Sequence, residues 1–359
     1  MGPPPHRGPE RASREPPAVT APPPLIDPSW LAARLGHPDL VVLDAGIGAH
    51  RHAPARIPGA RAFDLDGALS DHASPLPHTL PSPADLQREL RALGVDDRST
   101  VVLYDGAGIY SAPRAWWMLR AMGFDRAAVL DGGRPPPPPP PPPRGTARPA
   151  PAPPRGVAPR PPTTRLLLHP PATHTPPPAW CLLPPMGSDR AAVLDGGLPA
   201  WQAAGHPVST DRPAPAPAGD FTARPRPALL ADRDAVAAAL TDPATAVLDA
   251  RSRARFTGAA PEPRPHLRPG HLPGSTSLPF TDLLTPDGRH YLPLPALRAR
   301  LTSATAGRPH LVTTCGSGVT ACILAFAAHL TGHPAPAVYD GSWSDWGRPE
   351  TGLPAATGD

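Results

Sequence analysis

The sequence predicts an α/β protein built as two tandem domains, each a mostly parallel sheet flanked by helices on both faces. Three observations predict this fold class. Short apolar runs of strand type alternate with segments of helical character, which is typical of a parallel sheet covered on both faces. The same motifs occur in the same order in the two halves of the chain. At 359 residues, the chain is also long enough for two domains of ordinary size.

The repeated motifs are short, but they keep their order along the chain. Each half contains a strand ending in Val-Leu-Asp-Ala, a Pro-Gly turn, a second apolar strand, and an Asp-Gly turn with a tryptophan six residues after the aspartate. The matching ranges are 42–45 and 247–250, 57–59 and 272–274, 101–104 and 311–314, and 193–201 and 338–346. We therefore expect one fold to occur twice, as a tandem duplication.

The composition divides the chain into four parts. Residues 1–24 are rich in proline and arginine and have no apolar core, so we expect a disordered tail and no signal peptide. The first domain is expected over 25–210 and the second over 228–355. The Pro/Ala-rich stretch 211–227 between them has the composition of a linker.

One feature of the first domain departs from a clean duplication. Residues 122–133 recur at 186–197 with a single difference, Phe124 against Ser188. The segment between them, about 134–185, is dense in proline, which favours polyproline II and cannot enter a sheet. The domain has one place for the repeated strand, so the two copies should compete for it. The insert is a sequence artefact, a tolerated loop without function, or a Pro-rich ligand for a partner domain.

Charge and cysteine content exclude several classes of function. The net charge of +4 arises in 134–185, which has arginines and no acidic residue, so we expect no basic patch and no nucleic-acid partner. No apolar run is long enough to span a membrane. Three cysteines are too few for a disulfide framework, and none has zinc-ligand spacing. We expect a cytoplasmic protein that has no metal, no cofactor and no membrane association.

The residues that carry chemistry gather at 311–322. An apolar strand leads into Cys315, a Gly-rich turn follows, and a helix begins after it. This pattern places Cys315 at a helix N-terminus, where unpaired amides and the helix dipole favour an anion. A thiolate is the nucleophilic form of cysteine, and the same amides can hold the anionic outer sulfur of a persulfide. The loop residues expected to bind the substrate are Gly316, Gly318, Val319 and Thr320.

The loop CGSGVTAC resembles the active-site loop of the tandem-domain rhodanese family, closest to the 3-mercaptopyruvate and thiosulfate sulfurtransferases. The resemblance covers both folded domains and implies that only the C-terminal domain is catalytic. The first domain agrees, because Asp105 stands at the position that matches Cys315 and cannot carry sulfane sulfur.

The resemblance also implies further site residues. Arg255 and Arg264 match two arginines that bind the substrate carboxylate, and guanidinium groups suit such planar anions. Ser317 matches a loop serine that polarises or relays protons near the cysteine. Asp66 and His78 of the first domain are similar to a charge relay for that serine, although their spacing is one residue longer here and His72 is a competitor.

The remaining candidates have simpler interpretations. Cys322 is expected to be a buried structural residue, and Cys181 an incidental thiol in the insert. Arg251 and Arg253 are interpreted as solvated charges. The tryptophans are expected in the core or at the domain interface: Trp116, Trp117, Trp201, Trp343 and Trp346.

The predicted function is transfer of sulfane sulfur from 3-mercaptopyruvate, through a Cys315 persulfide, to cyanide or a thiol such as a thioredoxin-type dithiol. Thiosulfate is the alternative donor, but thiosulfate-preferring loops carry cationic residues straight after the cysteine, where this chain has neutral Gly316 and Ser317. A cysteine phosphatase or arsenate reductase would need an arginine at 321, where the residue is alanine. A non-catalytic rhodanese-like binding module is the alternative from another class.

Overall fold

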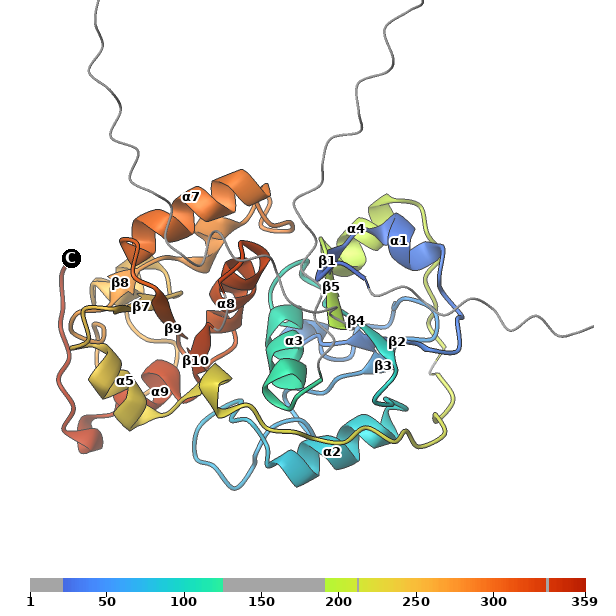
Figure 1. Ribbon diagram of the computed structural model, residues 1–359, viewed down its shortest axis with the longest axis horizontal. Coiled ribbons are helices and arrows are strands. Elements are labelled where there is room, and N and C mark those ends of the chain that lie inside the picture. The colour runs from blue at the N-terminus through green and yellow to red at the C-terminus, as the bar shows by residue number, and fades with distance from the viewer. Residues whose placement is uncertain (1–21, 125–190, 212, 334–335) are drawn as a thin grey trace, which may run out of the picture.

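Each half of the chain folds around its own five-stranded parallel sheet in the computed structural model (Figure 1), which describes residues 22–124, 191–211, 213–333 and 336–359. The strand orders are β1-β5-β4-β2-β3 and β6-β10-β9-β7-β8, so the two sheets have the same topology. Every strand pair within them is parallel. The predicted fold class and the predicted duplication of the fold are therefore confirmed.

The elements of the first domain are β1 (Leu25–Ile26), α1 (Pro28–Ala32), β2 (Leu40–Asp44), β3 (Arg61–Ala62), α2 (Pro83–Ala92), β4 (Thr100–Tyr104), α3 (Ala112–Ala121), β5 (Ala191–Leu194) and α4 (Gly197–Ala203). Those of the second are β6 (Leu230–Ala231), α5 (Arg233–Ala239), β7 (Thr245–Asp249), α6 (Arg253–Phe256), β8 (Thr276–Ser277), α7 (Leu294–Thr305), β9 (His310–Thr314), α8 (Ala321–Leu330), β10 (Ala337–Tyr339) and α9 (Ser342–Trp346).

Alternating side chains of each strand fill two separate cores. In β4, Val101 and Leu103 face α2 and α3, whereas Val102 and Tyr104 face α1 and α4. The second sheet is covered in the same way, by α7 and α8 on one face and by α5 and α9 on the other. Strands buried on both faces must be apolar along their whole length, which explains the continuous apolar runs in the sequence.

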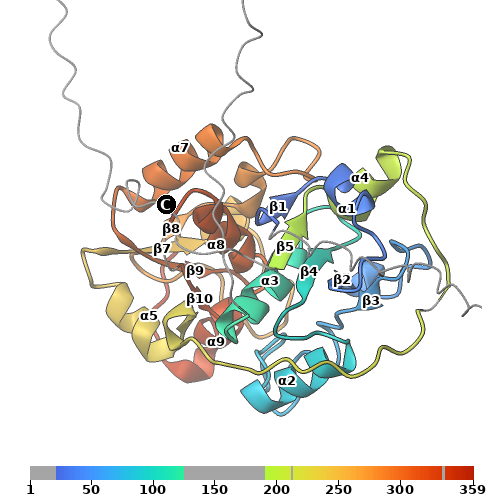
Figure 2. The same cartoon turned by 45° about the vertical axis from the view of Figure 1, so that its right-hand side comes forward.

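The two domains share one hydrophobic core where α3 packs against α8 at the centre of the molecule, a contact visible from two directions (Figures 1 and 2). Trp116 of α3 meets Phe326 of α8 edge to face, with ring centroids 4.7 Å apart. Both helices are buried along nearly their whole length. The carboxyl ends of β4 and β9 lead into these helices, so the loop after β9 lies close to the first domain.

The segment predicted as a linker lies against the first domain. Phe221 is buried in the shared core beside Phe124, with ring centroids 5.9 Å apart. The amide of Asp220 donates to Asp96, and the amide of Ala223 donates to Gln87. These contacts hold the linker along α2.

The predicted N-terminal tail reaches the described residues only at its end. The tail was expected to extend to residue 24, but the structure corrects its end: Pro22 and Pro24 are buried, and the carbonyl of Pro24 accepts the amide of Val193. A backbone that pairs with a strand end is part of the fold. The predicted insert 134–185 lies outside the described residues, as does Cys181.

The two copies of the repeated segment are used in different ways. Met122, Gly123 and Phe124 of the upstream copy close α3, and Ala191–Leu194 of the downstream copy forms β5 between β1 and β4. Residues 125–133 lie outside the described residues. Within the described part of the chain, the downstream copy therefore takes the strand position.

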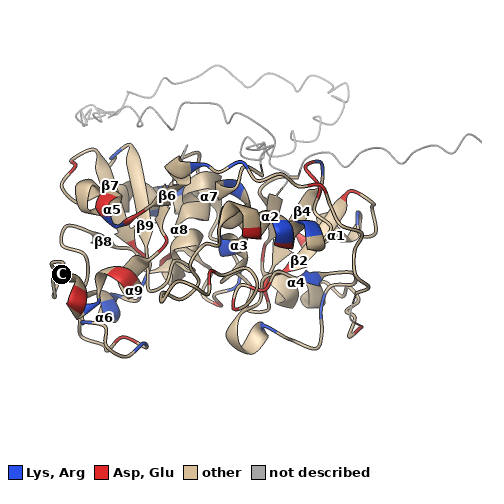
Figure 3. Cartoon of the chain, turned by 90° about the horizontal axis from the view of Figure 1, so that it is seen from below, with Lys and Arg blue, Asp and Glu red and all other residues tan. Residues whose placement is uncertain are grey.

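Charged residues of both signs are interspersed on the face shown in Figure 3. No helix among the described residues is long and apolar enough to cross a membrane.

Candidate active site

Cys315 is the first residue after β9 and lies at the wall of a cavity of about 600 Å³ between the two domains. Its side chain is 2% exposed, so the thiol is reached through this cavity and not from the open surface. The cavity wall also includes Asp66, His78, Tyr110, Arg255, Arg264, Gly316, Ser317, Val319 and Thr320. Most of the predicted site residues therefore meet in one place.

The cysteine loop is held in shape by Ser342, which the sequence reasoning missed. Its hydroxyl accepts the amides of Cys315 and Gly318, each at 3.1 Å, and donates to the carbonyl of Tyr339 at 2.7 Å. Ser342 has a φ of 50°, and its counterpart in the first domain is Gly197 with a φ of 53°. A serine at a left-handed position that its duplicate fills with glycine is the sequence signal that could have identified it.

Four amides of the loop remain available for an anion. Among the described residues, the structure gives no acceptor for the amides of Gly316, Ser317, Val319 and Thr320, and all four residues line the cavity. Gly318 was predicted with this group, but its amide is used by Ser342 and it does not line the cavity. Gly318 instead packs against Asp340 and Arg114, where a Cβ atom would come within 2.9 Å of the Asp340 carbonyl.

The first domain shows what such a loop can bind. Asp105 follows β4 at the position that Cys315 occupies after β9, and its buried carboxylate accepts five backbone amides, those of Ala107, Gly108, Tyr110, Ser111 and Ala112, at 2.8–3.0 Å. A turn that directs this many amides at one carboxylate has the geometry of an anion-binding site. In the second domain, a thiol takes the place of that carboxylate.

Two guanidinium groups lie over the residue that follows the cysteine. A Cβ atom built on Gly316 would be 3.0 Å from Nη2 of Arg255 and 3.6 Å from Nη1 of Arg264. A side chain at this position would make a tight contact with Arg255 and an ordinary van der Waals contact with Arg264. The glycine therefore lets the two cations approach the loop closely, and a larger residue would displace the Arg255 guanidinium.

Arg255 is oriented by Glu262, a second residue that the sequence reasoning missed. The Glu262 carboxylate is 2% exposed and accepts Nε of Arg255 at 3.2 Å and Nη2 at 2.5 Å. Its position between the two predicted arginines, as the one acidic residue in 255–264, was the available signal.

The interpretation of Arg251 as a solvated charge is wrong. Its side chain is fully buried, pairs with Asp249 and Glu262, and lies over the ring of Trp343 at 4.5 Å. Two carboxylates and an aromatic face compensate the buried guanidinium, and burial alone could not be inferred from the sequence. Arg253, by contrast, is exposed as expected.

Asp66, His78 and Ser317 form a continuous hydrogen-bonded chain across the domain interface. His78 Nε2 lies 2.9 Å from Oδ1 of Asp66, and His78 Nδ1 lies 3.1 Å from Oγ of Ser317. The other Asp66 oxygen accepts the amide of Gly48 at 2.9 Å. The competitor His72 bonds instead to the carbonyl of Gly67 on the exposed side of its loop.

The pKa values of His78 and Asp66 are set by their burial and by the interaction between them. Burial lowers the pKa of His78 below its ordinary value, with Asp66 opposing and Arg114 and Arg264 adding to the effect. Burial alone would raise the pKa of Asp66, but the Gly48 amide and His78 bring it below its usual value. At neutral pH the imidazole is therefore neutral and the carboxylate ionised. His78 then donates Nε2–H to Asp66 and accepts the Ser317 hydroxyl at Nδ1.

Cys322 is a buried residue in α8, as predicted. Its thiol is fully buried and donates to the carbonyl of Gly318 at 3.2 Å. Burial raises the pKa of Cys322 to about 12, which keeps the group protonated and unreactive. The five predicted tryptophans are all buried as well.

The sequence and the fold both have known relatives. The Rhodanese-like domain model matches residues 27–135 and 232–348. A probable 3-mercaptopyruvate sulfurtransferase of Pseudomonas aeruginosa is 35% identical over 351 residues, covering 93% of this chain and 98% of that protein. The Arabidopsis thaliana protein named thiosulfate/3-mercaptopyruvate sulfurtransferase 1, mitochondrial, is 32% identical, covering 92% and 77%.

Among solved structures, the Escherichia coli 3-mercaptopyruvate sulfotransferase SseA matches with a TM-score of 0.64 and 26% sequence identity, covering 90% of this chain and all of that one. Both domains match the family model, and the relatives match over nearly the full length. The chain therefore belongs to the rhodanese family, as a protein of two rhodanese-like domains in tandem.

Proposed function

We propose that this protein is a sulfurtransferase that takes sulfur from 3-mercaptopyruvate and passes it to a thiol or cyanide through a persulfide on Cys315. The observation that carries the proposal is one cavity that contains a thiol, a set of unpaired amides and two arginines. Relatives with this name support it. We also propose that the catalytic unit is the domain 228–355, joined through linker 211–227 to a non-catalytic domain 25–210.

The proposed first half-reaction moves one sulfur atom. The Cys315 thiolate attacks the donor sulfur, the C–S bond breaks, and its electron pair stays on carbon as the enolate of pyruvate. The proton from the donor thiol ends on that carbon, giving pyruvate, and Cys315 is left as an anionic persulfide. The amides of Gly316, Ser317, Val319 and Thr320 would stabilise this anion. Two of them, those of Ser317 and Thr320, stand at the positions of the Ala107 and Tyr110 amides that bind Asp105. A second thiol then removes the outer sulfur.

The remaining residues take roles that follow from their positions. Arg255 and Arg264 would bind the donor carboxylate and keto oxygen, because guanidinium groups bind planar oxyanions at two points. Ser317, hydrogen-bonded to His78 and through it to Asp66, would carry the proton from the donor thiol to the pyruvate carbon.

The geometry around Gly316 favours 3-mercaptopyruvate over thiosulfate. A cationic side chain at position 316, suited to a dianion, would have to displace the Arg255 guanidinium, because a Cβ atom there would already lie 3.0 Å from Nη2. The arginines lie where a carboxylate a few bonds from the sulfur could reach them. The name of the Arabidopsis relative includes both donors, so thiosulfate is the alternative to measure.

The proposed acceptor is a thioredoxin-type dithiol, and the proposed location is the cytoplasm. Both suit a reaction that needs Cys315 to return to the reduced state, and both described cysteines are free thiols. The acceptor is tested by comparing turnover with thioredoxin, glutathione and cyanide.

The deciding experiment measures pyruvate release and the intact mass of the protein after incubation with 3-mercaptopyruvate. We expect a gain of one sulfur atom at Cys315 and a ping-pong pattern. Cys315→Ser should lower the rate by at least about 10³-fold, because it removes the nucleophile. The matched control, Cys322→Ser, should stay within roughly threefold of wild type, since this buried thiol does not line the cavity and makes no contact with the donor.

The outcome also separates the alternatives. Faster turnover with thiosulfate than with 3-mercaptopyruvate would reassign the donor. A folded wild-type chain that acquires no sulfur from either donor would sink the enzyme proposal and leave a binding module.

A further inference from the structure

Arg114 of α3 is a buried cation that belongs to neither the hydrogen-bonded chain nor the substrate arginines. Its side chain is 0% exposed. Nη2 lies 2.6 Å from Oδ1 of Asp340 in the second domain and donates at 2.6 Å to the backbone carbonyl of His78. The guanidinium also lies over the ring of Trp117, 4.5 Å from its centroid. One side chain thus joins the second domain to the backbone of the residue that contacts Ser317.

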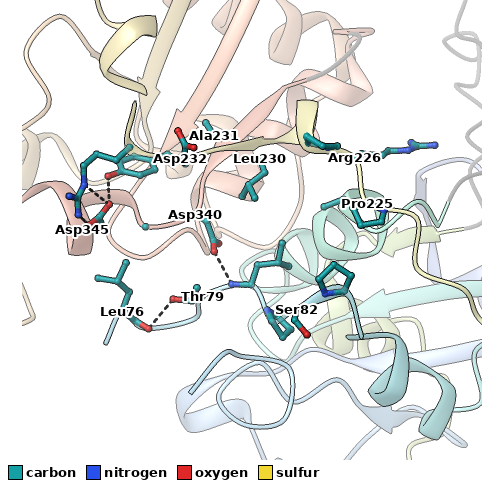
Figure 4. Close-up of a pocket in the computed structure, with 18 of the residues that line it drawn as sticks. Leu76, Thr79, Ser82, Pro225, Arg226, Leu230, Ala231, Asp232, Asp340 and Asp345 are labelled. Carbon is teal, nitrogen blue, oxygen red and sulfur yellow. Dashed lines mark hydrogen bonds and ion pairs between the residues drawn. The ribbon is translucent and has the colours of Figure 1, made fainter. Parts of the chain in front are cut away.

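Asp340 holds the same loop from the opposite side. Its second carboxylate oxygen accepts the amide of Leu80 at 2.8 Å, a contact across the domain interface that is visible in Figure 4, where Asp340 reaches toward the loop between Thr79 and Ser82. The ion pair therefore binds the backbone of this loop at two residues, His78 and Leu80, on either side of Thr79. His78 itself has a φ of 58°, a left-handed conformation that a non-glycine residue keeps only when its surroundings enforce it.

The same pair touches the cysteine loop. A Cβ atom on Gly318 would lie 2.9 Å from the Asp340 carbonyl and 3.0 Å from Nη1 of Arg114. Two residues after Asp340, Ser342 accepts the amides of Cys315 and Gly318. The ion pair is therefore located between the two loops whose side chains, His78 and Ser317, meet at 3.1 Å.

The arrangement is costly if its role is only to stabilise the fold. In the described part of the chain, Nε and Nη1 of Arg114 are buried without an oxygen or nitrogen acceptor, and the other side chain they meet besides Asp340 is the weakly accepting thiol of Cys322. A buried ion pair whose remaining donors are poorly satisfied contributes little net stability compared with apolar residues of the same volume. The presence of the Arg114–Asp340 pair is explained if it is needed to fix the positions of the two loops.

We propose that Arg114 and Asp340 are positioning residues that hold the His78 loop and the cysteine loop in register, so that His78 stays within hydrogen-bond distance of Ser317. The inference rests on the proposed sulfurtransferase function. According to this proposal, the His78–Ser317 hydrogen bond depends on the Arg114–Asp340 contact between the domains, which lies outside the cavity.

The test is a double-mutant cycle on the pyruvate-forming half-reaction of the full-length protein. Asp340→Asn, which is nearly isosteric, and Arg114→Met each remove the ion pair, and each is combined with His78→Gln. We expect each single variant to lower kcat by about 10- to 100-fold, the loss typical of misplacing a catalytic group by about 1 Å, with KM within roughly threefold. In the His78→Gln background, the same changes should cost less than about twofold, because the residue through which they act is absent.

Asp195→Asn is the matched control. Asp195 also makes an interdomain contact, accepting the amide of Tyr291 at 3.2 Å and lying 3.3 Å from His290, but it does not touch the His78 loop. Its kcat should match wild type within about twofold. If Arg114→Met fails to fold, Asp340→Asn decides alone.

Equal losses with and without His78, a change confined to KM, or no loss in Asp340→Asn would each overturn the positioning role. An inactive wild-type protein would instead refute the proposed function, so the two failures are distinguishable.

Discussion

At the scale of single residues, the protonation state of His78 controls the proposed chemistry. The pKa of His78 lies below 6.5, so the ring is neutral at pH 7. Below that pKa, protonation removes the lone pair on Nδ1 that accepts the Ser317 hydroxyl. We expect the rate of persulfide formation to fall on the acid side, at a pH below 6.5, and His78→Gln to abolish this acid limb while lowering the rate by about 10²- to 10⁴-fold.

Asp66→Asn is the companion variant for this prediction. The carboxylate raises the pKa of His78 against the effect of burial, so its removal should move the acid limb to lower pH. A pH–rate profile of single-turnover pyruvate release measures both effects. A limb that moves to higher pH in Asp66→Asn, or survives in His78→Gln, would contradict the assignment.

The same titration affects stability with a defined sign. The unfolded chain binds a proton at His78 as pH falls through 6.5, whereas the folded chain does so only at lower pH. Stability linked to His78 is therefore fully present above pH 6.5 and is lost as pH falls toward the folded pKa. Thermal melts at pH 7.5 and at a pH below 6 measure this effect. The melting temperature of wild type should fall more on acidification than that of His78→Gln.

At the scale of elements, the connection between α3 and β5 is the unusual feature. In the second domain, residues 331–336 suffice to lead from α8 to β10. Deleting 125–188 would leave 122–124 joined to 189–190, a connection of similar length with the uninterrupted sequence MGFDRAAVLDGG. We expect this variant to fold, to remain active, and to gain roughly 2 to 3 kcal/mol in unfolding free energy, because joining the ends of α3 and β5 through fewer residues costs less chain entropy.

A second deletion of equal length tests whether Phe124 stabilises the end of α3. Removing 122–185 yields the same protein except that Ser188 replaces Phe124. Phe124 is buried against Phe221, so the serine version should be less stable than the phenylalanine version by about 3 kcal/mol. Denaturant melts of both variants provide the comparison, and equal midpoints would show that Phe124 does not support the helix end.

At the scale of the whole molecule, the shared core should make the two domains unfold together. The α3–α8 contact is continuous with the cores of both sheets. Trp116→Ala should destabilise the protein by about 3 to 5 kcal/mol, since it opens a cavity in the interface. Calorimetry should show one transition for wild type. Trp30→Ala, on the partly exposed outer helix α1, is the control and should cost less. Two separate wild-type transitions would show that the domains are energetically independent.

The sequence by itself determined the strands, their repetition and the cysteine loop. Each depends on neighbours within a few residues: an apolar run predicts a buried strand, and a glycine-flanked cysteine before a helix predicts an anion-binding turn. Resemblance to the rhodanese family added Arg255, Arg264, Ser317, Asp66 and His78, which the structure brings to one cavity.

Only the tertiary structure decided which copy of the repeated strand enters the sheet, that Arg251 is buried, and that Glu262 and Ser342 orient the site. The contact between His78 and Ser317, and the Arg114–Asp340 pair beside it, join residues more than 200 positions apart. No local sequence pattern specifies such pairs, because they form when α3 packs on α8. Once that packing buries a charged side chain, the charge is stable only if an opposite charge or a hydrogen-bond partner lies beside it.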